Sequence, residues 1–222
     1  MKFPDAYQGI KKIFTAELLS LIGSACMIIF AIFGLVTVAA YQANSADALV
    51  AGSIGTIIFG LAGGVLALIG LIFLLIGTKR ASIDEPVFNN AFMFIILSLV
   101  LTVASTIISS IWATGIWDNV STTVANIFSV FAMIYIINGI QNLASKLDRP
   151  DMVTMGNTYM ILMIIVYAIQ IIARIIPAFF GANATTSTAA GVLSLVAEIF
   201  ALVVYIIYLI YLGKAKKMLK ES

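Results

Sequence analysis

Long apolar stretches separated by short polar segments dominate this chain of 222 residues. A helix needs roughly 20 apolar residues to cross the hydrocarbon core of a bilayer. Six stretches meet this requirement, and the first four contain no Asp, Glu, Lys or Arg. The pattern therefore predicts an all-α, polytopic integral membrane protein that forms one membrane domain, residues 1–222. The predicted transmembrane helices are residues 18–40, 54–76, 91–112, 120–140, 158–180 and 190–212.

The basic residues are confined to alternate connecting segments, with one exception. The N-terminal segment, the second-to-third loop, the fourth-to-fifth loop and the tail 213–222 hold eleven of the twelve Lys and Arg residues. Loops on the cytoplasmic side of a membrane carry an excess of these residues. We therefore expect a multi-pass plasma-membrane protein with both termini in the cytoplasm. The eleven residues are Lys2, Lys11, Lys12, Lys79, Arg80, Lys146, Arg149, Lys214, Lys216, Lys217 and Lys220.

The segment before the first span has its own pattern. Its apolar residues recur at helical spacing beside two lysines, which predicts a short amphipathic helix, residues 1–17, lying on the inner leaflet. A cytoplasmic extension of the first span is the alternative. The apolar residues are Phe3, Tyr7, Ile10 and Phe14.

The loops before the third and fifth spans resemble each other. Both contain Asp, Pro and Asn, as in Asp84 to Asn90 and Asp148 to Asn157. This similarity predicts three helical hairpins repeated in tandem. The alternative is that inner loops converge on these residue types because they must turn.

Small and hydroxylated residues predict how the helices pack. Gly52, Thr56, Gly60 and Gly64 recur every four residues in the second span, and such residues let two helix backbones approach closely. Packing inside the molecule, a contact with a partner or second copy, and a transport hinge remain open. In the third span Ser98, Thr102, Ser105, Thr106 and Ser109 predict either interhelical hydrogen bonds or a hydrated wall.

Two charged residues interrupt the last two spans. Arg174 lies in the fifth and Glu198 in the sixth, and their distances from the outer ends of these spans place them at similar depth. Gln170 lies one turn from Arg174, and Pro177 predicts a helix kink nearby. A charge inside the membrane is costly and is associated with function. The two residues therefore predict either a structural ion pair or a functional site.

Polar residues of other spans fall at comparable depth. Together with Arg174, Glu198 and Gln170, the residues Thr56, Thr106 and Asn126 predict a polar pocket in the outer third of the bundle. A third interpretation is that Arg174 extends outward to lipid headgroups. The pocket hypothesis predicts transport of a small polar solute or ion. The alternative is a non-catalytic assembly, regulatory or immunity-type subunit that acts through a membrane protein partner or homodimer.

Composition narrows the function classes further. The chain has no histidine and one cysteine, Cys26, which excludes histidine-based nucleophilic catalysis and histidine metal sites. We expect no enzyme activity, no cofactor and no bound metal. The net charge of +2 is explained by the helix ends and gives no indication of nucleic-acid binding. The lipid bilayer is the one partner that the sequence predicts directly.

Overall fold

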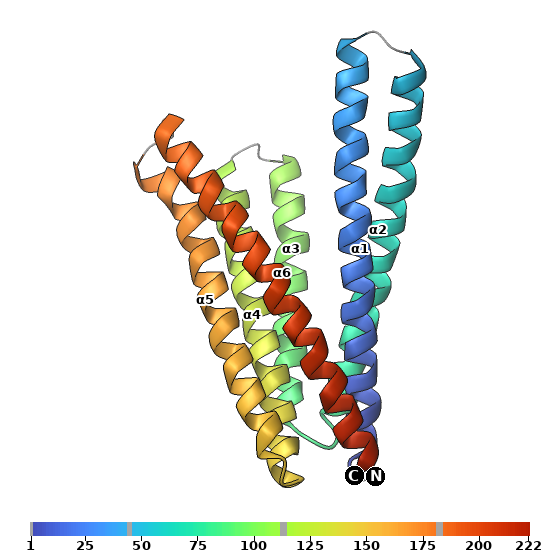
Figure 1. Ribbon diagram of the computed structural model, residues 1–222, viewed down its shortest axis with the longest axis vertical. Coiled ribbons are helices and arrows are strands. Elements are labelled where there is room, and N and C mark those ends of the chain that lie inside the picture. The colour runs from blue at the N-terminus through green and yellow to red at the C-terminus, as the bar shows by residue number, and fades with distance from the viewer. Residues whose placement is uncertain (1, 44–45, 112–114, 181–183) are drawn as a thin grey trace. The chain divides into compact units, whose positions relative to one another are not determined.

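A computed structural model of the chain describes residues 2–43, 46–111, 115–180 and 184–222. It contains six helices, all long and apolar enough to span a membrane, and this confirms the predicted all-α fold with six candidate spans (Figure 1). The helices are α1 (Pro4–Gln42), α2 (Ala46–Ala81), α3 (Val87–Ile111), α4 (Gly115–Lys146), α5 (Pro150–Phe180) and α6 (Ala184–Glu221).

The structure differs from the prediction at the N-terminus. The segment expected to form a separate interfacial helix is continuous with the first span, because α1 runs unbroken over 39 residues. Pro4 occupies the first turn, where its missing N–H is harmless, and no proline follows it in the helix. Ala16, Glu17 and Leu18 at the expected junction all favour helix. The form observed is therefore the extension of the first span.

The chain divides into two compact units, which we describe separately. Unit 1 comprises Met1–Ile10 and Thr78–Ser222, and unit 2 comprises Lys11–Gly77. In unit 1, α3 packs on α4 and α5 packs on α6, while α4 also contacts α5 and α6. In unit 2, α1 packs on α2, with the rings of Phe33 and Phe59 stacked at a centroid distance of 5.7 Å. Consecutive helices thus form three hairpins.

Glycines determine how closely α1 and α2 approach in unit 2. A Cβ atom at Gly52 would lie 2.5 Å from the Thr37 hydroxyl oxygen, and one at Gly60 would lie 2.9 Å from the Phe30 ring. These two glycines of the predicted stripe therefore face α1. Gly64 differs, because a Cβ there would have no other atom of the described residues within 4 Å.

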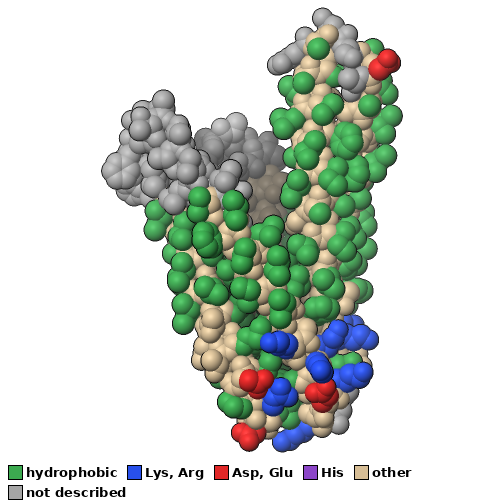
Figure 2. Space-filling model, in the orientation of Figure 1, with side chains coloured by type: hydrophobic (Ala, Val, Ile, Leu, Met, Phe, Trp, Pro, Cys, Tyr) green, Lys and Arg blue, Asp and Glu red, His purple; other side chains and the backbone are tan. Residues whose placement is uncertain are grey.

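Many of the described buried residues of unit 1 lie at one end, which we call the cap and define as residues 2–10, 78–90, 141–157 and 211–222. Charged side chains gather on its surface, whereas aliphatic side chains cover the helices beyond it (Figure 2). The combination of an apolar interior and a charged surface resembles a small soluble core attached to lipid-exposed helices. Buried apolar residues of the cap include Ala6, Ile10, Ala81, Phe88, Leu143, Ala144, Met152, Leu212, Ala215 and Leu219.

Candidate functional site

A buried carboxylate occupies the centre of the cap. Glu85 lies in the turn between α2 and α3 and is only 4% exposed. Lys146 Nζ donates a hydrogen bond of 2.7 Å to one of its oxygens, and Asn142 Nδ2 donates one of 3.1 Å to the other. Both donors come from the last turns of α4. The contacts therefore fasten the α2–α3 turn to the end of α4.

The surroundings of Glu85 keep it ionised. Burial by itself raises the pKa of this carboxyl group, but the hydrogen bonds from Lys146 and Asn142 and the charge of Lys146 lower it. The net effect is a pKa below the ordinary value of 4.5. A carboxylate with a lowered pKa and two donors is a poor proton carrier at neutral pH. The geometry therefore assigns Glu85 to joining segments of the cap.

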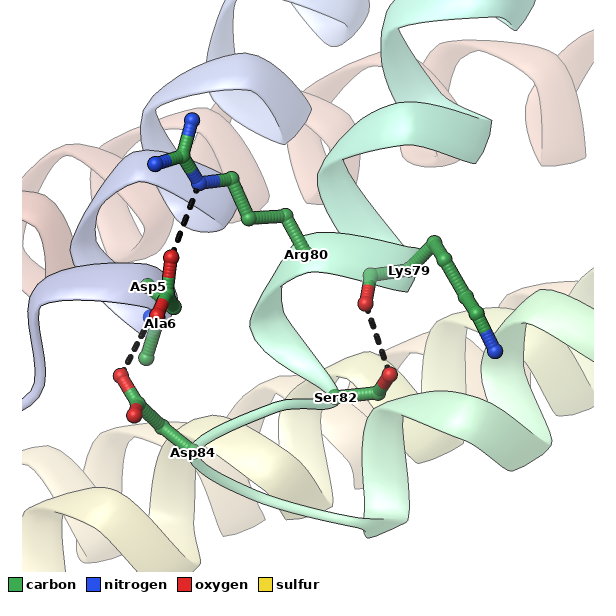
Figure 3. Close-up of polar contacts among 6 residues, drawn as sticks. All are labelled: Asp5, Ala6, Lys79, Arg80, Ser82 and Asp84. Atoms are coloured by element: carbon green, nitrogen blue, oxygen red, sulfur yellow. Dashed lines mark hydrogen bonds and ion pairs between the residues drawn. The ribbon is translucent and has the colours of Figure 1, made fainter.

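The start of α1 is attached to the same turn. Asp84 accepts a hydrogen bond of 2.7 Å from the backbone N–H of Ala6, and Arg80 Nε donates one of 3.1 Å to Asp5 (Figure 3). The first backbone N–H groups of a helix lack partners within the helix, so Asp84 acts as a cap supplied from another segment. At the end of α2, the Ser82 hydroxyl donates to the Lys79 carbonyl at 2.7 Å.

Both chain termini lie in the cap (Figure 1). The backbone N–H of Lys2 donates to the Ser222 hydroxyl at 3.4 Å, and Lys2 Nζ donates to the Lys146 carbonyl at 3.5 Å. The Nζ atoms of Lys2 and Lys146 lie 5.8 and 5.9 Å from the centre of the Phe3 ring. The N-terminal segment thus connects the end of α4 with the end of α6.

A second polar contact joins α4 to α5. Gln141 Nε2 donates to the Val153 carbonyl at 3.0 Å and to Asn157 Oδ1 at 2.8 Å. Gly156 allows this approach, since a Cβ there would lie 2.7 Å from Gln141 Nε2 and 2.8 Å from the Tyr211 hydroxyl. A larger residue at position 156 would therefore displace these two side chains or the helices that carry them.

The predicted outer pocket is described only in part. The Thr56 hydroxyl donates to the Gly52 carbonyl at 2.8 Å in unit 2, and the Thr106 hydroxyl donates to the Thr102 carbonyl at 2.9 Å in unit 1. Asn126 is half-buried on α4. The two threonines thus bond their own helices, a common arrangement for hydroxyls in membrane helices.

Four predicted residues have side chains outside the part that the structure describes. They are Gln170, Arg174 and Pro177 on α5 and Glu198 on α6. Helix α5 is continuous through Pro177, where the sequence predicts a kink. The α5 and α6 helices that carry Arg174 and Glu198 pack on each other. The ion pair itself stays a prediction.

Serines of α3 form a seam with α4. The hydroxyls of Ser98 and Ser129 lie 2.9 Å apart, and those of Ser105 and Ser121 lie 2.6 Å apart. Ser98 also donates to the Ala125 carbonyl at 3.0 Å. These contacts favour the interhelical interpretation of the hydroxyl stripe over the hydrated wall for the two serines involved.

The residues that the sequence analysis missed are those of the cap. Glu85 and Lys146 stand in loops already marked by their charge, but nothing in the sequence pairs them across 61 positions. Within the described ranges, no group of three His, Cys, Asp or Glu residues is placed to hold a metal ion. Comparison of the chain with protein-family models, with curated proteins and with solved structures gave no match.

Proposed function

We propose that this membrane protein lies in the plasma membrane with both termini in the cytoplasm. The distribution of basic residues supports this orientation, because the cap of unit 1 combines both termini with the Lys and Arg residues of two loops. Basic segments remain preferentially on the cytoplasmic side during insertion.

We further propose that it acts as a non-catalytic membrane subunit of the assembly, regulatory or immunity type. The observation that carries this proposal is the open face at Gly64, since Gly52 and Gly60 of the same stripe are already used against α1. The neighbouring Leu61 and Leu68 are exposed as well. A small residue between two aliphatic side chains lets the backbone of a partner helix approach closely, and packing of this kind drives helix association in lipid.

The substitution Gly64→Leu tests this function. Because space is open at this position, the variant should fold normally but lose its complex with a second membrane protein, or with its own copy, after cross-linking in native membranes. Gly34→Leu is the matched control, since a Cβ at Gly34 also has no described atom within 4 Å, but the positions four residues away on either side hold the large residues Phe30 and Val38 and form no small-residue stripe. An unchanged cross-linking pattern in Gly64→Leu would contradict the proposal.

Transport of a small polar solute or ion is the second candidate. It is favoured by the packing of α5 on α6, because these helices carry Arg174 and Glu198. The exchange of the two charges, Arg174→Glu with Glu198→Arg, should preserve a structural pair but abolish stabilisation by a transported solute. If small solutes never change the thermal stability of the purified protein, this candidate loses its support.

A further inference from the structure

Helix α6 has two distinct faces near the cap. One face is buried and carries Val204, Tyr208, Tyr211, Ala215 and Met218. A second face carries aliphatic residues with about half of their surface exposed, namely Val203 at 48%, Ile206 at 44% and Ile210 at 50%. Packing inside the molecule accounts for the first face and leaves the second open to lipid.

The exposed face of α6 changes from aliphatic to cationic residues after Ile210. Lys214 and Lys217 are exposed and follow Ile210 at spacings of four and seven residues, so they continue the same helix face. With a rise of 1.5 Å per residue, the two backbone positions lie roughly 6 and 10 Å beyond Ile210. The headgroup region of one leaflet is roughly 5–7 Å thick. Lysine side chains extend toward such a layer, so both ammonium groups can reach phosphate depth.

Three other basic residues of the cap are paired with carboxylates. Arg80 pairs with Asp5, Lys146 with Glu85 and Arg149 with Asp151. Lys217 Nζ lies 3.9 Å from the Glu221 carboxylate, with both side chains largely exposed, so this pair is loose and screened. Lys214 is not among the ion pairs found in the described residues. Lys214 and Lys217 are therefore available to an external anion.

We infer that this face of α6 binds an anionic phospholipid. The acyl chain lies along Val203, Ile206 and Ile210, and the headgroup phosphate contacts Lys214 and Lys217. An anionic phospholipid matches both parts of this face. Its acyl chain suits the exposed aliphatic residues, and its negative headgroup suits the two lysines that follow them. This inference goes beyond the proposed function, since it concerns lipid recognition and not a protein partner.

Lipid binding to the detergent-purified full chain tests the inference. Native mass spectrometry would follow titrations with dioleoyl phosphatidylglycerol and dioleoyl phosphatidylcholine, which differ in headgroup charge but share their acyl chains. A basic residue near an anionic surface strengthens binding about fivefold. We therefore expect the double variant Lys214→Gln with Lys217→Gln to bind phosphatidylglycerol about 30-fold more weakly than the original protein. Binding of phosphatidylcholine should not change.

Arg149→Gln provides the control, because this residue is an exposed cation of the cap that is already paired with Asp151. It should reduce phosphatidylglycerol binding far less than the double variant does. Equal binding of the two lipids, equal losses in the control and the double variant, or no loss in the double variant would each overturn the inference. Displacement of the lipid by an equal concentration of inorganic phosphate would also overturn it, since that result indicates a site for soluble anions.

Discussion

Lys146 Nζ lies 2.7 Å from the carboxylate of Glu85, although 61 residues separate them in the chain. The carboxylate side chain is 6% exposed and the lysine side chain is 48% exposed. This pair joins the turn after α2 to the last turn of α4. Positive charge at that position also complements the negative end of the α4 dipole. The contact thus stabilises the cap in two ways.

Removal of the lysine should destabilise unit 1. Lys146→Met keeps the aliphatic stem but leaves a buried carboxylate with Asn142 as its remaining side-chain donor. A hydrogen bond to a charged group contributes about 1.5–3 kcal/mol, and the exposure of Lys146 argues for the lower part of this range. Equilibrium unfolding in detergent should therefore show a loss of about 1.5–2 kcal/mol.

The double variant Glu85→Gln with Lys146→Met is the control for this prediction. The two residues interact directly, so their effects should not add, and the double variant should be more stable than the sum of the single losses indicates. Additive losses would mean that each residue acts through other contacts.

The lowered pKa of Glu85 predicts a specific dependence of stability on pH. When the pKa is lower in the folded protein than in the unfolded chain, the group's contribution is complete above the unfolded value and is lost as the pH falls through the folded value. The difference in unfolding free energy between the original protein and Glu85→Gln should be constant from neutral pH to just above 4.5 and should shrink below it. A difference that persists unchanged at about pH 3 would contradict the assignment.

Gly156 should tolerate no side chain. Gly156→Ala would place a methyl group 2.7 Å from Gln141 Nε2 and 2.8 Å from the Tyr211 hydroxyl, so these side chains or the helices that carry them must shift. Forcing extra volume into a packed interior costs about 1–3 kcal/mol, which equilibrium unfolding would detect. Gly64→Ala is the matched control, because alanine is the better helix former and space is open there. Equal losses in the two variants would refute a steric role for Gly156.

Each hydrogen bond of the serine seam between α3 and α4 should contribute little to the free energy of unfolding. Ser98→Ala removes hydrogen bonds to Ser129 and to the Ala125 carbonyl. Interhelical hydrogen bonds in membrane proteins contribute on average about 0.6 kcal/mol, so we expect a loss of that order in the unfolding free energy. A loss of solute binding without any loss of stability would instead favour the hydrated wall.

The sequence was sufficient for the number and type of the helices, because lipid imposes a simple requirement for long apolar stretches. The sequence was a poor guide to where the helices begin and end. Helix α1 has 39 residues and α6 has 38, because helix formation continues past the apolar stretch wherever no proline intervenes. An apolar stretch in the sequence predicts which part of a helix lies in the hydrocarbon core, but it does not predict where the helix begins or ends.

The sequence did not predict which residues come together in the cap. Arg174 and Glu198 attract attention because they interrupt apolar runs, whereas Glu85 and Lys146 stand in loops where charge is expected. Their pairing depends on how α4 packs against the turn after α2, which is a tertiary contact that no local pattern reveals. The same holds for Gly156, whose role depends on side chains from α4 and α6.

The orientation of the cap in the membrane is the central claim and is tested most directly by labelling of single cysteines. In a protein with Cys26→Ser, the variants Asp47→Cys and Ser222→Cys would be treated with a membrane-impermeant maleimide in intact cells and again after the membrane is opened. We expect Asp47→Cys to react in intact cells and Ser222→Cys to react only after opening. Labelling of Ser222→Cys in intact cells, or of both positions from the same side, would contradict the account.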